Sequence, residues 1–404
     1  MASKPIVAAP HILLPRPGVD LSKYAVIACD QFTSQPEYWR ELENLIKDAP
    51  STLRMIFPEA YLGLVDTDAY IKNINATIAS YLNKKTLVDI GAGFVLVDRS
   101  TPYVKRRLGL MLAIDLESYS FDKGTKAPIR ASEATIVERI PPRLKVRENA
   151  SVELPHVLVL FDDPSKSIIE SLYNARDAYP LVYDFELNQA GGHIRGYHIK
   201  NTATIIDKLQ KLTSPDGLLF IVGDGNHSLA TAKAHWDKIK MGLPLDKRDD
   251  HPARYSLVEA INIYDDGLQF EPIHRIVFNA EKDFMPGLAQ RLTGPCRSSY
   301  YSKAEGSKPL SLPQNSPMAY KIVQDYVDGY IKNHPGSHVD YIHGIDDLCK
   351  IADGNPTAVG LIMPTLTKGD IFEYIAKGDV LPRKCFSMGH AVEKRYYLEA
   401  KSIK

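Results

Sequence analysis

The chain has no excess of charge of either sign, because 49 Lys and Arg residues balance 49 Asp and Glu residues. Proteins built to hold long nucleic acids normally carry a basic excess, so the composition argues against nucleic acid as a partner. Cysteine is also scarce: there are only four, and none belongs to a Cys-x-x-Cys pair. This scarcity fits a reducing compartment and argues against a cysteine zinc site.

Long apolar runs are absent as well. No stretch approaches about eighteen uninterrupted apolar residues, so we expect neither a membrane span nor a membrane partner. Residues 1–10 lack a cationic segment followed by an apolar run. We therefore expect no signal peptide and a cytoplasmic location.

What remains is an ordinary globular composition, with 44% hydrophobic and 24% charged residues over 404 positions. Short apolar runs alternate with amphipathic stretches, which indicates an α/β or α+β fold built on a mixed sheet. The sequence changes in character after residue 278. We therefore expect a catalytic or nucleotide-binding core at 1–280 and a C-terminal α/β lobe at 281–404.

Two local patterns give expectations for the later part of the chain. The turn at 265–267, Asp-Asp-Gly, predicts a hairpin in which strands at 256–264 and 268–278 pair. Gly, Ser and Pro cluster at 294–316, and such clusters are typical of loops. We expect a long loop or the boundary of a small subdomain there.

The most informative motif is a buried apolar run at 218–222 followed by Gly223-Asp224-Gly225-Asn226-His227-Ser228. After it, apolar residues at helical spacing predict an amphipathic helix. A tight turn at a helix start presents backbone N–H groups to an anion, and the helix dipole adds to the attraction. Asp224 adds a carboxylate and His227 an imidazole. The same residue types also serve as plain turn and cap residues, so a structural role stays open.

Further candidates lie elsewhere in the chain. Arg139 and Arg143 follow Glu133 in a basic stretch, where guanidinium groups could hold phosphate and Glu133 could act as a base. A solvated surface helix explains the same stretch. His274 and Arg275 are neighbours on a predicted strand, so at most one of them faces a given site.

Several of these stretches together resemble the domain-of-unknown-function 1015 family. The stretches are Ala28–Ser34 with Tyr38-Trp39, the region of Glu133 and Arg143, Val222–Ser228, Pro272–Arg275, and Leu381–Lys384 with Phe386–Gly389. The resemblance covers nearly the whole chain. Its Asp-Gly-Asn-His turn is similar to the Asp-Gly-His-His-Arg turn of the free serine kinases, which share a fold with ParB-type partition proteins and sulfiredoxin. The resemblance therefore implies a ParB/sulfiredoxin-like core with a nucleotide-phosphate site at the turn.

Residue by residue, the resemblance makes Asp224 the catalytic aspartate and metal ligand, and His227 a phosphate-contacting catalytic residue. Glu133 is the looser candidate for the base. The phosphate or nucleotide would contact Gly223, Gly225, Asn226, Ser228, Arg139, Arg143, His274 and Arg275. Two departures matter: Asn226 stands where the kinases have a first His, and Ser228 where they have Arg, which removes a bidentate phosphate contact. Another basic residue would have to replace that Arg.

The function that these observations favour is a nucleotide-dependent phosphotransferase acting on serine or O-phosphoserine, with ADP or ATP as donor and Mg²⁺. A ParB-like nucleotide-binding regulator and a phosphoserine phosphatase using the same site are the alternatives. A metal hydrolase using His193, His227 and His235 is disfavoured, because His227 and His235 are two helical turns apart. The oligomeric state is left open.

Overall fold

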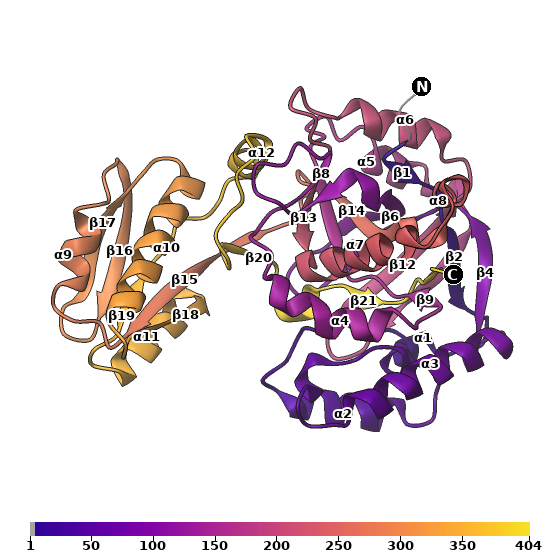
Figure 1. Ribbon diagram of the computed structural model, residues 1–404, viewed down its shortest axis with the longest axis horizontal. Coiled ribbons are helices and arrows are strands. Elements are labelled where there is room, and N and C mark those ends of the chain that lie inside the picture. Colours follow the sequence, from indigo (N-terminus) through magenta and orange to yellow (C-terminus); the bar gives the residue numbers. More distant parts are fainter. Residues whose placement is uncertain (1–4) are drawn as a thin grey trace. The chain divides into compact units, whose positions relative to one another are not determined.

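The computed structural model describes residues 5–404, apart from the side chains of residues 296–297. Residues 1–4, part of the segment considered above for a signal peptide, and the Cys296 side chain lie outside that description. The chain forms two compact units (Figure 1). The first comprises residues up to 131, 135–268 and 390–404, and the second comprises 132–134 and 269–389. The boundary between the two compact units lies at 268/269, whereas the boundary expected from the sequence lies at 280/281. The C-terminal tail, residues 390–404, belongs to the first unit.

The first unit is built on a mixed sheet with the strand order β11-β12-β5-β6-β14-β10-β13-β8-β7, and β1 pairs with β6. Most neighbours are antiparallel, but β10 runs parallel to β14, and β8 runs parallel to both β13 and β7. The strands are β1 Val7–Ala8, β5 Phe94–Ser100, β6 Arg107–Asp115, β7 Tyr119–Ser120, β8 Ile129–Ala131, β10 Leu158–Phe161, β11 Leu181–Leu187, β12 Gly192–Ile199, β13 Phe220–Asp224 and β14 Tyr255–Asn262. The expected mixed α/β fold is confirmed.

Shorter pairs complete this unit. They are β2 (His11–Pro15) with β4 (Leu87–Ala92), β3 (Val26–Ile27) with β21 (Tyr396–Tyr397), and β9 (Val152–Glu153) with β22 (Lys401–Ser402). The last two pairs join the C-terminal tail to earlier parts of the chain. The α-helices are α1 Leu21–Tyr24, α2 Pro36–Ile46, α3 Thr67–Asn83, α4 Ile140–Arg147, α5 Ile169–Asn174, α6 Ala203–Lys211, α7 Asn226–Met241 and α8 Leu245–Arg248.

Two strands explain where the unit's core lies. All nine residues of β6 are buried, and their run of apolar side chains is typical of a strand covered on both faces. In β13, Phe220, Ile221 and Val222 are buried and the strand ends at Asp224. The core of the sheet thus ends where the polar turn before α7 begins.

The second unit has a sheet in the order β17-β16-β19-β15-β18, with β20 also paired to β15. Its strands are β15 Phe270–Phe278, β16 Cys296–Ser302, β17 Gly306–Leu312, β18 His338–His343, β19 Val359–Leu361 and β20 Phe386–Met388. Its α-helices are α9 Phe284–Ala289, α10 Ser316–Asn333, α11 Ile345–Gly354 and α12 Lys368–Ala376. No helix in the described part of the chain is long and apolar enough to span a membrane.

Two sequence predictions about pairing are wrong. The turn at Asp265 forms, since its carboxylate accepts from Gly267 N–H at 2.8 Å, but β14 and β15 do not pair. β14 pairs with β6 and β10, whereas β15 pairs with β18, β19 and β20. The predicted loop at 294–316 contains the hairpin β16–β17. Its glycine and serine residues are typical of loops, so no strand signal is visible in the sequence there. A turn signal is local, while strand pairing is decided by partners distant in sequence.

Candidate functional site

The start of α7 follows the end of β13 through a left-handed glycine. Gly225 is the N-cap of the helix, with φ of 80°, and it provides no capping side chain. A Cβ at this position would lie 3.0 Å from Val157 Cα, closer than ordinary contacts allow. Glycine is therefore required both by the backbone conformation and by the close approach. The sixteen-residue helix directs the positive end of its dipole at this turn.

Asp224, the last residue of β13, lies directly before this helix start. Its Oδ1 accepts a hydrogen bond from Gly225 N at 2.9 Å, and its Oδ2 pairs with Lys394 Nζ at 3.2 Å. Lys394 is buried, with 9% of its surface exposed, so its charge lies in a region of reduced solvent screening. The structure thus places a carboxylate and an ammonium group beside the positive end of α7.

A hydrogen-bond network continues from the first turn of α7. Ser228 Oγ lies 2.9 Å from His156 Nε2, and His156 Nδ1 lies 2.6 Å from the Tyr397 hydroxyl. The Tyr397 hydroxyl also accepts from Cys29 N–H and donates to Cys29 Sγ, each at 3.2 Å. Burial raises the pKa of the Cys29 thiol to about 12, so this sulfur stays protonated and unreactive. The nucleophilic and basic groups of the network are therefore Ser228 and His156.

Asp30 adds a second carboxylate to this cluster, with Oδ2 at 3.8 Å from His156 Nε2. Burial opposes its ionisation, but the His156 imidazole and a hydrogen bond from the Gln31 amide overcome this and lower the Asp30 pKa. The charges of Lys394 and Arg143 lower it further. Asp30 is thus ionised at neutral pH and lies among cationic groups from three other segments.

Glu59 provides a third carboxylate, and it forms an ion pair with Arg143. Burial raises the Glu59 pKa, and the charge of Arg143 opposes the rise. Arg143 also donates to the Arg139 carbonyl at 3.0 Å, and the side chain of Arg139 itself is exposed. Of the two predicted phosphate-binding arginines, Arg143 therefore belongs to the cluster that contains Asp30.

His227 turns toward the chain that precedes α4. Its Nε2 accepts a hydrogen bond from Ile136 N–H at 3.2 Å, and its carbonyl accepts from Thr231 Oγ1 at 2.7 Å. Because Nε2 accepts, the imidazole carries its proton on Nδ1 when neutral. His227, Gly223 and Asn226 are all half-buried.

The remaining predicted site residues belong to the second unit. Glu133 accepts a hydrogen bond from Cys385 N at 3.3 Å, and burial raises its pKa. His274 accepts from Met363 N at 3.1 Å, and burial lowers its pKa to about 4. Arg275 is fully buried and donates to protein oxygens, which are those of Ile273, Gln324 and Arg383.

Sequence reasoning missed much of the cluster around α7. Neither Asp30 nor His156 was among the predicted site residues. Glu59, Lys394 and Tyr397 belong to no motif that the sequence shows. The one available signal was a carboxylate at the end of a short buried strand or a few residues beyond it, which Asp224 and Asp30 share.

The fold and this cluster define a mixed α/β protein with acidic, basic and hydroxyl groups gathered at one helix start. A family model described as "Protein of unknown function (DUF1015)" matches residues 13–341. The chain therefore belongs to this family, and the resemblance found in the sequence is confirmed. No curated protein matches the chain.

Several solved structures share a distant likeness with the chain. A free serine kinase variant in complex with ADP has a TM-score of 0.41 at 10% identity, covering 76% of this chain and 95% of its own. A conserved hypothetical protein from Pyrococcus furiosus has a TM-score of 0.34 at 10% identity, with coverages of 71% and 90%. C-terminally truncated SbnI from Staphylococcus aureus has a TM-score of 0.38 at 12% identity, with coverages of 69% and 83%. Likenesses at this distance carry no argument about the reaction.

Proposed function

We propose that the protein is a nucleotide-dependent phosphotransferase whose acceptor is a small hydroxy amino acid, most simply serine, or whose donor is O-phosphoserine in the reverse direction. The observation that carries this proposal is the start of α7, where Gly225 leaves the helix without a capping side chain and Asp224 pairs with Lys394. Phosphoryl transfer needs positioned phosphates, cations and one base rather than covalent chemistry by the protein. This cluster offers each of these.

The phosphates of ADP or ATP would bind at the turn from Gly223 to Ser228, where the helix dipole favours an anion. Lys394 and Arg143 supply positive charge to the same cluster, and either could replace the arginine that the kinase turn has at the position of Ser228. In this proposal His274 and Arg275 have no part, because their polar atoms already bind groups inside the second unit.

Mg²⁺ fits the residues present. It prefers oxygen ligands and is commonly held by one or two carboxylates together with substrate phosphates. Asp224 Oδ2 pairs with the Lys394 ammonium at 3.2 Å, and a bound ion would take the place of this ammonium, which would then be available to the phosphates. Asp224 would hold the ion, and the ion would supply charge neutralisation of the phosphates.

The acceptor hydroxyl needs a base, and Asp30 is the group best suited to this role. It is ionised at neutral pH and lies 3.8 Å from His156, which in turn lies 2.9 Å from Ser228. His156 and Ser228 would orient the bound amino acid through hydrogen bonds. Glu133 stays the competing candidate for the base, and burial raises its pKa.

The test measures phosphoserine formed from serine and ATP or ADP with Mg²⁺, by mass spectrometry. Asp224→Asn is expected to lower turnover by about 100-fold or more, because it removes charge where the phosphates and metal bind. The matched control is Asp237→Asn on the same helix, whose half-buried carboxylate pairs with Lys233 and Lys240, and it should keep full activity.

A second comparison identifies the base. If Asp30 takes the proton, Asp30→Asn loses turnover at unchanged nucleotide affinity while Glu133→Gln stays active; the opposite result assigns the role to Glu133. A chain that binds nucleotide, as shown by a raised melting temperature, but never transfers phosphate to or from serine would overturn the phosphotransferase and favour a regulator.

A further inference from the structure

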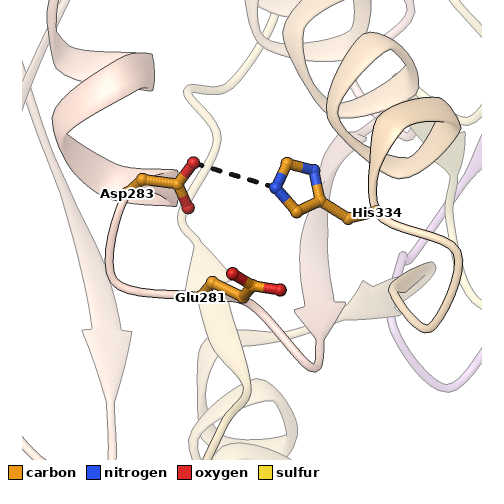
Figure 2. Close-up of side chains that lie close together, drawn as sticks. All are labelled: Glu281, Asp283 and His334. Atoms are coloured by element: carbon orange, nitrogen blue, oxygen red, sulfur yellow. Dashed lines mark ion pairs between the residues drawn. The ribbon is translucent and has the colours of Figure 1, made fainter.

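Three side chains that ligate metals meet in the second unit, apart from the α7 cluster (Figure 2). Glu281 and Asp283 lie directly before α9, and His334 is the C-cap of α10. One potential ligand atom from each residue lies within 4.8 Å of the other two. Figure 2 shows both carboxylates directed toward the same side of the imidazole ring.

A single residue, Tyr330, positions all three. Its carbonyl accepts a hydrogen bond from His334 Nδ1 at 2.9 Å, and its ring stacks on the imidazole with centroids 3.8 Å apart. Its hydroxyl accepts from Glu281 N–H at 3.0 Å and donates to Asp283 Oδ1 at 3.3 Å. Metal-ligating histidines and carboxylates usually have outer partners of this kind, which fix their orientation.

The contact with the Tyr330 carbonyl also decides which imidazole nitrogen is available. A carbonyl oxygen only accepts, so Nδ1 carries the proton and the lone pair of neutral His334 is on Nε2. That nitrogen faces Asp283 Oδ2 at 3.8 Å, which is too long for a direct hydrogen bond. The separation suits two ligands of one ion, each at about 2.0–2.2 Å from it.

We propose that Glu281, Asp283 and His334 bind a divalent transition metal ion of the zinc type. One imidazole and two carboxylates form a donor set that suits zinc, and a set with three protein ligands leaves a position for water or an anion. Ca²⁺ and Mg²⁺ prefer sites made of oxygen alone, so they should compete poorly. Glu281 and Asp283 are exposed, so the ion reaches the site without any rearrangement of the unit. This proposal does not depend on the phosphotransferase.

The competing explanation is a simple ion pair between protonated His334 and Asp283. That pair would give Glu281 no role and would not bind zinc. The two explanations therefore differ in measured metal content and in the effect of replacing Glu281.

The test dialyses the full-length chain against Zn²⁺ and measures bound metal by mass spectrometry. We expect about one zinc per chain for the unaltered protein and at least about a tenfold loss of affinity in His334→Ala. The matched control is His11→Ala, since His11 forms an exposed pair with Asp89 at 2.8 Å that has no third ligand among the described residues. It should bind zinc like the unaltered chain.

Two conservative variants are measured as well, so that the test does not depend on the folding of His334→Ala alone. Glu281→Gln changes an exposed side chain and should weaken zinc binding, whereas the ion-pair explanation predicts no change. Tyr330→Phe keeps the stacked ring and the carbonyl but removes the hydroxyl, so we expect binding about tenfold or more weaker. Zinc bound equally by the unaltered chain, His334→Ala and Glu281→Gln, or by none of them, would overturn the site.

Discussion

Two buried arginines, one from each unit, have different partners. In the first unit, Arg395 lies between the carboxylates of Glu259 and Glu399, and all three side chains are almost inaccessible to solvent. In the second unit, Arg275 is equally buried but donates to carbonyl and amide oxygens, and its guanidinium lies over the rings of Tyr320 and Tyr341. The Arg395 guanidinium pairs with buried carboxylates. The Arg275 guanidinium instead connects segments of the second unit through hydrogen bonds to uncharged oxygens.

The Arg395 arrangement has parallels in the first unit. Asp115 pairs there with Arg254, and Asp224 pairs with Lys394. An opposite charge close by favours the charged form of each partner, and the proposed phosphate site requires charged groups. The second unit leaves its ligand cluster at the surface, where a dissolved ion reaches it directly.

The largest expected effect comes from breaking the buried ionic group. Arg395→Met leaves two buried carboxylates without a cationic partner, so we expect a loss of about 3–5 kcal/mol in the free energy of unfolding. Arg275→Met leaves carbonyl oxygens unsatisfied, which costs less, about 1–3 kcal/mol. Urea unfolding measures both. Tryptophan fluorescence follows the first unit, because Trp39 and Trp236 both lie there, and circular dichroism follows the whole chain.

The control for both variants is Arg195→Met. Arg195 pairs with Asp184 at the surface, and exposed pairs of this kind contribute at most about 1 kcal/mol. Equal losses in Arg395→Met and Arg275→Met would contradict the contrast between these two arginines.

A smaller effect is expected from a pair of left-handed glycines, one in each unit. Gly306, the first residue of β17, has φ of 65° with open space where a Cβ would go, so Gly306→Ala costs only backbone strain, about 1–2 kcal/mol. Gly225→Ala adds a clash with Val157 at 3.0 Å, so its loss should be larger by about 1–3 kcal/mol.

The two glycines also differ in function under the phosphotransferase proposal. Gly225→Ala should weaken nucleotide binding, measured by calorimetry, because the turn before α7 must shift, whereas Gly306→Ala should bind normally. Normal nucleotide affinity in Gly225→Ala would show that the turn before α7 is not part of the nucleotide site.

The smallest expected effect is on the pH dependence of stability. Burial lowers the pKa of His235 in the first unit and of His274 in the second to about 4, from an ordinary value of 6.5. Between these values the unfolded chain binds protons that the folded chain does not, so stability is full above pH 6.5 and falls as the pH drops toward 4.

Replacing either histidine by Asn removes the contribution of that histidine to the fall in stability at acid pH. His235→Asn should flatten the acid dependence seen by tryptophan fluorescence, and His274→Asn only the dependence seen by circular dichroism. An acid slope that neither variant changes would show that these imidazoles titrate alike in the folded and unfolded chain.

Parts of the fold and of the candidate site were predictable because their signals are local. The run ending at Val222, the glycine at 225 and the helical spacing after it gave β13, the turn and α7 correctly. The cap of α3 is local in the same way, since the Asp66 carboxylate accepts from the N–H groups of Asp68 and Ala69.

The rest of the α7 cluster was not predictable. Asp30, His156 and Lys394 come from positions far apart in sequence, and each by itself has an ordinary local explanation as a turn, core or surface residue. The three became recognisable as neighbours only through hydrogen bonds and charges that cross the first unit.

Composition and residues a few positions apart were enough to establish the mixed α/β class, the family, the strand–turn–helix at Asp224 and the neutral overall charge. Other features depend on the folded chain: β14 and β15 enter different sheets, residues 296–312 form a hairpin, and the tail brings Lys394 to Asp224. The meeting of His334 with Glu281 and Asp283 is of the same kind. The physical reason is that strand pairing and side-chain convergence are set by burial between distant segments, which no local pattern encodes.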